Sequence, residues 1–355
     1  MRKKSVLVID DSAFMRKLIS EMINSSQHFY VCGTAVNGEI GLQKMERLNP
    51  DVVTLDLLMP VKDGLDTLKI IMKDFPRPVI MVSAYTKAGA RSTIRALELG
   101  AFDFIAKPSG EISPDISLIR EELLEKLRSA IRADLGNLKA TSHPDSEKID
   151  TQKLSQPAKS HRVISIAAST GGPQALLWLL PSLPSDIPAT LLIVQHMPRD
   201  FTNQFAQRLD KICKIKVKEA EEGDLLRNGW AFIAPGDYHL TLDRKMASAK
   251  QKIIKLNQDP PVYGVRPSAD VLFYSVAACC GSDAMGIVLT GMGKDGAKGL
   301  RMIRDAGGLA VIQSPESAVI NGMPKAAIST AGADNIVPLD EMGNFIIQQL
   351  KKYNN

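Results

Sequence analysis

Polar side chains with complementary chemistry follow successive apolar runs in the first third of the chain. Asp10 and Asp11 come directly after one run, and Asp56 follows another. Ser83 and Lys107 follow two further runs. Because the carboxyl ends of parallel strands meet at one edge of a sheet, we expect all of these side chains to lie close together.

This set of residue types suits a phosphate-accepting site. Three carboxylates at one edge repel one another unless a cation intervenes, and a small number of oxygen ligands suits Mg²⁺. Ser83 is able to hydrogen-bond a phosphoryl oxygen, and Lys107 supplies a compensating positive charge. The pattern predicts that Asp56 accepts a phosphoryl group while Asp10, Asp11 and Asp56 hold magnesium. Any one aspartate also has a simpler interpretation, since a residue after a strand commonly caps the next helix.

A second group of reactive side chains lies in the other half of the chain. Ser169 follows an apolar run within residues 168–173, Ala-Ser-Thr-Gly-Gly-Pro. A serine on a strand-to-helix turn with small neighbours is similar to a nucleophile elbow, although Ala167 replaces the first glycine of G-x-S-x-G. The alternative is a glycine-rich phosphate-binding turn at a helix N-terminus. That alternative is disfavoured because neither Gly-Lys-Ser/Thr nor G-x-G-x-x-G is present.

A serine nucleophile needs a base and a group that orients the base. Of five histidines, His196 directly follows a strand-like run and should share the sheet edge with Ser169. His239, in a Pro-Gly-rich region, is a less constrained candidate. Asp295 follows a third run and is the natural orienter, although it is also placed to cap the next helix. The order serine, histidine, aspartate differs from that of α/β-hydrolases, which predicts a separate fold with the same chemistry.

Backbone N–H groups are the expected partners of the tetrahedral oxyanion that ester or amide hydrolysis forms. The N–H groups of Thr170 and Met292 are candidates because each lies in one of the predicted catalytic loops.

The elements that must position these groups follow an alternating strand and helix pattern. A longer helix is expected to start with Ser113 as N-cap and Pro114 at the first helical position, and to run to about Leu135. We predict an N-terminal (βα)5, flavodoxin-like domain. Its expected strands cover residues 5–9, 30–34, 52–55, 79–82 and 102–105.

The second half of the chain predicts a doubly wound parallel α/β sheet with a small antiparallel β-hairpin insertion. Three short strands punctuated by Pro235-Gly236, at 230–234, 239–242 and 252–256, are expected to form this antiparallel ribbon. The polar segment between the halves is typical of a flexible linker. The predicted division is 1–138, 139–161 and 162–355. Expected strands cover 162–167, 190–194, 285–289 and 309–312, and expected helices 201–212 and 300–305.

Composition narrows the class of protein. No apolar run reaches the roughly 18 residues that span a bilayer, and the first run is too short for a signal peptide. We therefore expect a cytoplasmic protein that is not embedded in a membrane. The net charge of +5 is spread along the chain, which disfavours nucleic acid as a partner. The four cysteines show no metal-ligand spacing, and Cys279 and Cys280 are expected to be core thiols.

Residues 5–135 resemble the receiver domain of two-component response regulators. The resemblance rests on Val-Ile-Asp-Asp-Ser at 8–12, Leu-Asp-Leu-Leu-Met-Pro at 55–60, Ser-Ala at 83–84 and Ile-Ala-Lys-Pro at 105–108. It implies phosphoryl transfer from a histidine kinase to Asp56, with Mg²⁺ held by Asp10 and Asp11 and the backbone near Met59. Phe104 matches the switch aromatic of these domains, although on its own it is equally well a core residue.

Residues 162–350 resemble the catalytic domain of the chemotaxis protein-glutamate methylesterases. The matching stretches are 168–172, 195–198 (Gln-His-Met-Pro), 234–236 (Ala-Pro-Gly), 266–270 (Arg-Pro-Ser-Ala-Asp) and 289–296 (Leu-Thr-Gly-Met-Gly-Lys-Asp-Gly). The resemblance implies Ser169 as nucleophile, His196 as base and Asp295 as orienting acid, with no cofactor for the esterase reaction. It implies as substrates the methylglutamates of methyl-accepting chemotaxis receptors, with deamidation of specific glutamines, and a chemotaxis histidine kinase as phosphodonor.

A receiver joined to a hydrolase predicts regulation. We expect the unphosphorylated receiver to pack against the catalytic edge and phosphorylation of Asp56 to shift that equilibrium. Arg266 is placed either to touch an acidic receptor helix or to make a structural hydrogen bond to backbone. Two alternatives stay open: a hydrolase of the same mechanism acting on a non-receptor protein, and a non-catalytic response-regulator binding module.

Overall fold

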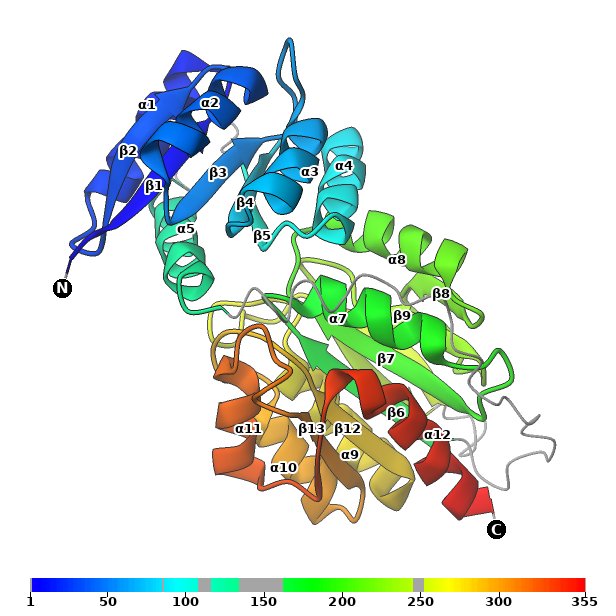
Figure 1. Ribbon diagram of the computed structural model, residues 1–355. Coiled ribbons are helices and arrows are strands. Elements are labelled where there is room, and N and C mark those ends of the chain that lie inside the picture. The colour runs from blue at the N-terminus through cyan, green and yellow to red at the C-terminus, as the bar shows by residue number, and fades with distance from the viewer. Residues whose placement is uncertain (1, 85, 108–115, 134–161, 245–251, 355) are drawn as a thin grey trace. The chain divides into compact units, whose positions relative to one another are not determined.

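The computed structural model describes residues 2–84, 86–107, 116–133, 162–244 and 252–354. The chain divides into two compact units, Met1–Lys139 and Ala140–Asn355. The predicted linker 139–161 lies outside the described residues, and so do Pro108, Ser113, Pro114 and Leu135. Each unit is an α/β fold with a parallel sheet (Figure 1).

The first unit is a five-stranded parallel sheet of order β2-β1-β3-β4-β5, as the flavodoxin-like prediction requires. Strands β1, β3 and β4 are buried along nearly their whole length, which suits a sheet covered by helices on both faces, whereas the edge strand β2 is only partly buried. The elements are β1 (Lys4–Ile9), α1 (Ala13–Asn24), β2 (Phe29–Ala35), α2 (Gly38–Leu48), β3 (Val52–Asp56), α3 (Gly64–Asp74), β4 (Val79–Ser83), α4 (Lys87–Glu98), β5 (Asp103–Ala106) and α5 (Ile116–Ala130).

The end of α5 corrects one prediction, since the helix ends at Ala130 rather than near Leu135. The N–H of Arg132 donates to Ser129, three residues back, which marks a tightened final turn. Ile131, counted in the apolar pattern, is 36% exposed and so does not extend the packed face.

The second unit has a seven-stranded parallel sheet of order β14-β13-β12-β6-β7-β9-β8, together with a two-stranded antiparallel ribbon, β10-β11. The elements are β6 (Arg162–Ala168), α7 (Gly172–Leu179), η1 (Leu180–Ser182), β7 (Ala189–Gln195), α8 (Phe201–Ile212), β8 (Lys216–Glu219), β9 (Trp230–Ile233), β10 (His239–Arg244), β11 (Lys252–Asn257), α9 (Ala269–Cys280), η2 (Gly281–Asp283), β12 (Ala284–Val288), α10 (Ala297–Asp305), β13 (Leu309–Gln313), α11 (Gly322–Ala331), β14 (Asn335–Val337) and α12 (Leu339–Asn354).

The doubly wound sheet and the antiparallel hairpin are confirmed, but β9 does not belong to the hairpin. It pairs parallel with both β7 and β8, with Leu191 opposite Ala231. The pattern of a short strand carries no information about its direction, and the Pro235-Gly236 turn after it suggested a ribbon. The ribbon begins only after that turn.

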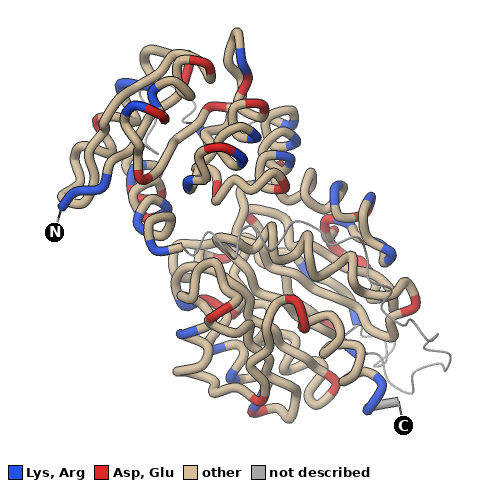
Figure 2. The backbone as a smooth tube through the Cα atoms, viewed as in Figure 1, with Lys and Arg blue, Asp and Glu red and all other residues tan. Residues whose placement is uncertain are grey.

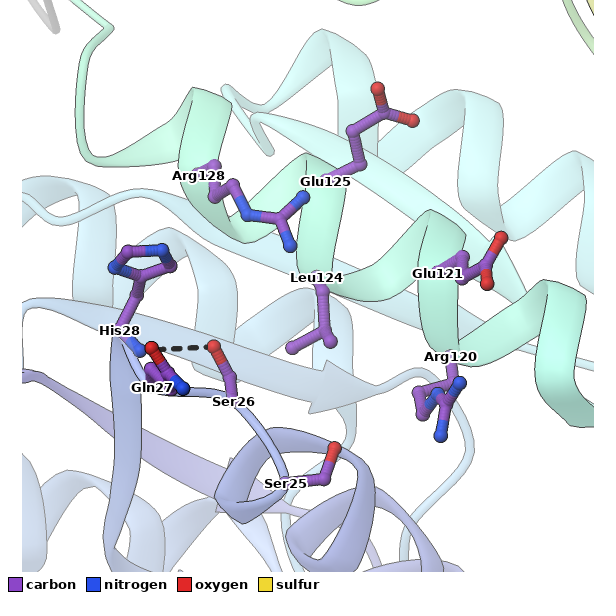
Figure 3. A pocket seen from close by; sticks show the side chains of 9 residues that line it. All are labelled: Ser25, Ser26, Gln27, His28, Arg120, Glu121, Leu124, Glu125 and Arg128. Atoms are coloured by element: carbon purple, nitrogen blue, oxygen red, sulfur yellow. Dashed lines mark hydrogen bonds between the residues drawn. The ribbon is translucent and has the colours of Figure 1, made fainter.

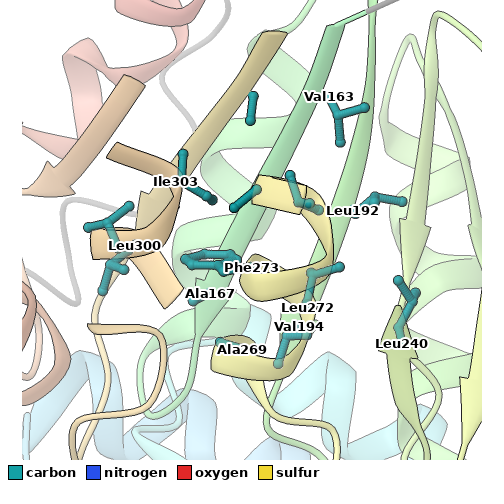
Figure 4. Close-up of a cluster of buried hydrophobic side chains, with 14 of the residues drawn as sticks. Val163, Ala167, Leu192, Val194, Leu240, Ala269, Leu272, Phe273, Leu300 and Ile303 are labelled. Atoms are coloured by element: carbon teal, nitrogen blue, oxygen red, sulfur yellow. The ribbon is translucent and has the colours of Figure 1, made fainter. Parts of the chain in front are cut away.

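The core of the second unit holds α9 against the sheet. Leu272 and Phe273 of α9 are fully buried and lie in one cluster with Val163, Leu192 and other residues of β6 and β7 (Figure 4). Burial of a large apolar side chain contributes about 1.5–3 kcal/mol. These contacts hold the start of α9 firmly in place. Cys279 and Cys280 are partly buried and pack against this same cluster.

Basic and acidic positions are interspersed along both units (Figure 2). Among the described residues, no helix is both long and apolar enough to cross a membrane.

Candidate functional site

The carboxyl edge of the first sheet gathers an acidic cluster around one lysine. One carboxylate oxygen from each of Asp10, Asp11 and Asp56 lies within 4.8 Å of the other two. Nζ of Lys107 is 3.0 Å from Oδ2 of Asp10 and 2.8 Å from Oδ2 of Asp56. The structure thus brings together four of the residues that the strand-end pattern placed at one site.

The acidic cluster carries more negative than positive charge, which favours binding of a cation. Burial raises the pKa of Asp56, the neighbouring Asp10 raises it further, and Lys107 only partly opposes them. Burial lowers the pKa of Lys107, but the carboxylates of Asp56 and Asp10 raise it. The net shift is upward, so Lys107 stays positively charged. Oδ2 of Asp10 and Oδ2 of Asp56 are buried, and Lys107 places only one positive charge against the three carboxylates. Two such oxygens beside an exposed third carboxylate fit a hard cation such as Mg²⁺.

The other predicted receiver residues lie beside this cluster or just behind it. Ser83 is fully buried at the end of β4, with Oγ 3.4 Å from the carbonyl oxygen of Ala84. Phe104 is 3% exposed in β5, and Nζ of Lys126 lies 5.1 Å from its ring centroid. Phe104 therefore points inward in this structure.

The loop after Asp56 has a strained turn that the sequence pattern did not reveal. The N–H of Lys62 donates to the carbonyl of Pro60 at 2.8 Å, which closes a three-residue turn centred on Val61. Val61 has a φ of 69° and is 79% exposed. A β-branched residue is unfavourable in that region. The turn resembles a γ-turn with positive φ, which is rare and strained.

In the second unit, Ser169 follows β6 directly and is held by the two neighbouring strand ends. Its N–H donates to the carbonyl of Thr290 at 3.1 Å, and the side chain of Gln195 donates to its carbonyl at 3.0 Å. Gly171 has a φ of 76°, which allows the chain to turn sharply from β6 into α7. The predicted strand-turn-helix around Ser169 is confirmed.

His196 and Asp295 are joined by a hydrogen bond. Nε2 of His196 lies 2.9 Å from Oδ2 of Asp295, and the backbone N–H of His196 donates to Ala168, directly before Ser169. Asp295 is 3% exposed. The carboxylate and the imidazole are thus fixed relative to each other at the edge where Ser169 emerges.

Asp295 also caps α9, a role that no sequence signal indicated. Its Oδ2 accepts the N–H of Ala269 at 2.6 Å, and its Oδ1 accepts the N–H of Asp270 at 3.0 Å and the hydroxyl of Ser268 at 2.7 Å. These are donors that a helix start leaves unpaired. The sequence had suggested instead that Asp295 could cap the helix after it.

The charge of Asp295 is stabilised by these contacts. Burial acts to raise the pKa of Asp295, but the bond to His196, its positive form and the N–H groups of α9 outweigh burial and lower the pKa. A carboxylate at the N-terminus of a helix is favoured further by the helix dipole.

His239, the other candidate base, is structural. It is fully buried, its Nδ1 accepts the N–H of Ser268 at 3.1 Å, and its Nε2 lies 3.3 Å from the carbonyl of Pro260. Both ring nitrogens are occupied by backbone, so His239 positions Ser268 rather than reaching Ser169.

The candidate oxyanion donors lie on two segments that meet at Ser169. A Cβ added to Gly291 would stand 2.8 Å from Cβ of Ser169, so only glycine permits this approach. Thr170 follows Ser169, and Met292 follows Gly291. Thr170 is 4% exposed.

Arg266 takes the structural option. Its guanidinium donates to the carbonyls of Gln258 and Asp259 at 2.9 and 3.0 Å and pairs with Asp237. These bonds fix the segment ahead of α9, which leads into Ser268, a hydrogen-bond partner of Asp295.

A hollow of about 660 Å³ in the first unit lies away from the acidic cluster of that unit. It is bordered by the turn from α1 to β2, including His28, and by Arg120, Leu124 and Arg128 of α5 (Figure 3). That turn precedes β2, so it lies at the amino edge of the sheet, opposite the edge of Asp56.

Comparison with known proteins assigns both units. The family model described as CheB methylesterase matches residues 164–346, and that of the response regulator receiver domain matches residues 6–113. The chain belongs to the CheB methylesterase family. The protein-glutamate methylesterase/protein-glutamine glutaminase of Pyrococcus horikoshii is 44% identical over 355 residues, 99% of this chain and 94% of that protein. Its counterpart in Halalkalibacterium halodurans is 45% identical over 350 residues, 98% of each chain.

Structure agrees with sequence for the second unit. The crystal structure of the Thermotoga maritima CheB methylesterase catalytic domain matches with a TM-score of 0.52 and 36% identity, and covers 54% of this chain and 99% of that one. As a member of the CheB methylesterase family the protein is a hydrolase preceded by a response regulator receiver domain. The predicted enzyme class is confirmed, and the alternative of a non-catalytic binding module is set aside.

Proposed function

We propose that the protein hydrolyses glutamate γ-methyl esters on methyl-accepting chemotaxis receptors through Ser169, His196 and Asp295, and deamidates specific receptor glutamines by the same route. The observation that carries the proposal is the bond between His196 and Asp295 beside Ser169. The names of the relatives, which specify both protein glutamate and protein glutamine, support this choice of substrate.

The chain's own residues supply each part of the reaction. Ser169 Oγ attacks the ester carbonyl carbon while His196 takes its proton. Because Nε2 of His196 is hydrogen-bonded to Asp295, we propose that Nδ1 is the ring nitrogen that takes the proton of Ser169. Asp295 holds the tautomer and stabilises the positive imidazole.

The intermediate then collapses with balanced transfer of atoms. The carbonyl oxygen carries the negative charge, and the N–H groups of Thr170 and Met292 are proposed to stabilise it. The C–O bond to the methoxy group breaks, and His196 returns the proton, so that methanol leaves and an acyl ester remains on Ser169. Water, deprotonated by His196, hydrolyses that ester and regenerates the serine. With glutamine the leaving group is ammonia.

The receiver is proposed to control this reaction. Asp56 accepts a phosphoryl group from a chemotaxis histidine kinase. Mg²⁺, held by Asp10, Asp11 and Asp56, neutralises phosphoryl charge when bound, and Lys107 and Ser83 contact the phosphoryl oxygens. Phosphorylation then weakens inhibition of the catalytic unit by the receiver, with Phe104 as the switch residue. We also propose that the protein acts in the cytoplasm, where these partners meet.

The experiment is methanol release from methylated receptor membranes, with and without a small phosphodonor. We expect the phosphodonor to stimulate release, Asp56→Asn to make release insensitive to the phosphodonor, and Ser169→Ala to abolish release. The fragment 162–355 is expected to be faster than the unphosphorylated full chain. A fragment no faster than the full chain would refute inhibition by the receiver. Release from a different methylated protein but not from receptors would favour a non-receptor target.

A further inference from the structure

A cluster of exposed cationic and aromatic side chains borders the proposed catalytic residues, and hydrolysis itself does not use it. Lys294 directly precedes Asp295, and Lys298 lies in the first turn of α10; both are exposed. Their Nζ atoms lie 4.8 and 5.9 Å from the ring centroid of Tyr263. In the described part of the chain, neither ammonium group has a carboxylate within ion-pair distance. Two cations therefore share one ring and face solvent.

Two further exposed side chains extend this surface. Tyr274 of α9 is 41% exposed, and Met302, one helical turn after Lys298, is 47% exposed. Interactions with Tyr263, and more weakly with Tyr274, raise the pKa of Lys298, so both rings lie near one ammonium group. We name this surface the rim cluster: Tyr263, Tyr274, Lys294, Lys298 and Met302.

Folding stability does not explain the arrangement. Tyr263 has a φ of 52°, an unfavourable conformation for a bulky side chain. Lys298 places a positive charge at the positive end of the α10 dipole, and no acidic residue stands in that first turn. Unfavourable conformations of this kind collect at functional sites.

The rim cluster lies close to the nucleophile along the chain. Gly291 contacts Ser169, and Lys294 is three residues further on. Three residues span at most about 11 Å, and a lysine side chain reaches beyond its own backbone. A polypeptide that presents a side chain to Ser169 therefore passes close to Lys294, whose ammonium group shares the ring of Tyr263 with Lys298.

We propose that the rim cluster binds an acidic, amphipathic helical segment that carries the ester, and so sets which glutamyl esters are hydrolysed. This inference rests on the proposed function. Each hydrolysis turns a neutral ester into a carboxylate, so a segment with several such glutamates would present carboxylates beside its remaining esters, and these complement Lys294 and Lys298. Tyrosine and methionine provide apolar contact area for the apolar residues of such a helix, as they do at protein interfaces.

The test compares two helical peptides of equal length, each with one glutamate γ-methyl ester. The neighbouring positions on the contact face are glutamate in the acidic peptide and glutamine in the neutral one. With the full chain, Mg²⁺ and a small phosphodonor, we expect kcat/KM to favour the acidic peptide roughly three- to tenfold, as two exposed charge pairs allow. The preference should fall as salt is added.

The double variant Lys294→Gln/Lys298→Gln is expected to bring this preference close to one, mainly through KM for the acidic peptide. The control Lys351→Gln/Lys352→Gln removes the same charge from exposed positions of α12 and should keep the preference. If the unmodified chain shows no preference, or the double variant retains it, the proposed role of the rim cluster in substrate selection is refuted. Hydrolysis of the ester in that experiment would still support the proposed function. Hydrolysis of neither peptide refutes both.

Discussion

Replacing Asp295 with asparagine keeps the size of the side chain but replaces one acceptor oxygen with an NH₂ donor. The carboxylate faces four donors: the ring of His196, the hydroxyl of Ser268 and the N–H groups of Ala269 and Asp270. An asparagine NH₂ in the place of Oδ2 would face Ala269, and in the place of Oδ1 it would face Asp270. The hydroxyl of Ser268 is able to rotate and the imidazole of His196 to change tautomer, so each can act as an acceptor. A backbone N–H remains a donor in a fixed direction. Either orientation leaves one buried N–H unpaired.

The expected loss of stability follows from these contacts. A buried donor without an acceptor costs about 1–3 kcal/mol, and loss of an anion at a helix N-terminus costs about 0.3–1 kcal/mol. Relief of carboxylate burial offsets part of this, so we expect Asp295→Asn to lower the free energy of unfolding of the second unit by about 2–3 kcal/mol. The loss should be largest near neutral pH. Because folding lowers the pKa of Asp295, its contribution is present above the unfolded pKa of about 3.9 and is lost as pH falls through the folded pKa.

The same change should impair catalysis more than stability. An asparagine partner favours the wrong tautomer of His196, which in a serine triad lowers kcat by about 10⁴-fold. We expect kcat to fall by about 10³- to 10⁴-fold under conditions where the variant is folded. Ser268→Ala is the matched control, because it removes one bond to the same carboxylate and keeps the charge. It should cost about 1 kcal/mol and leave kcat within about tenfold.

Both quantities are measurable on the full chain. The two tryptophans, Trp178 and Trp230, lie in the second unit, so urea unfolding followed by their fluorescence reports on that unit alone. The rate of methanol release in urea-free buffer at neutral pH gives kcat. An Asp295→Asn variant as stable as the parent would refute the capping role. A kcat within tenfold of the parent would refute the orienting role.

Three further predictions concern other positions. Asp56→Asn should abolish phosphorylation yet stabilise the receiver by about 1 kcal/mol at neutral pH. Because folding raises the pKa of Asp56, the neutral carboxyl stabilises the receiver fully below the unfolded pKa, and this stabilisation is lost as pH rises through the folded pKa. The difference in stability between the parent and the always-neutral asparagine variant should therefore vanish in acid. Val61→Gly should raise the free energy of unfolding by about 0.5–1 kcal/mol by removing strain, whereas Val36→Gly, also exposed but without a positive φ, should lower it; both are read by receiver melting. His239→Gln should lower stability by about 1–3 kcal/mol without shifting the pH profile of kcat, while His196→Gln should abolish turnover; a pH profile moved by His239→Gln would make it a candidate base.

The sequence predicted where each reactive residue lies because parallel strands bring their carboxyl ends to one edge. Asp10 and Asp56, at the ends of different strands, are both ion-paired to Lys107 for that reason. The same rule placed His196 beside the segment of Ser169. Such placements depend only on the alternation of apolar runs, which a single sequence displays.

Other features depend on contacts between distant segments. Asp295 caps α9 although 26 residues separate it from Ala269, and no local pattern announces that bond. The sequence also left His239 open as a base, because only its burial against Ser268 and Pro260 excludes it. The direction of β9 was misassigned because its neighbours β7 and β8 are chosen by packing, not by its own residues.

If Ser169 is the nucleophile, it becomes acylated by the glutamyl group during ester hydrolysis. Mass spectrometry of the full chain, acid-quenched during turnover of a methyl-ester peptide and digested, measures this directly. We expect a peptide adduct on the fragment that contains Ser169, formed as methanol is released and absent in Ser169→Ala. Methanol release at the parent rate by Ser169→Ala, or an adduct on a different residue, would contradict it.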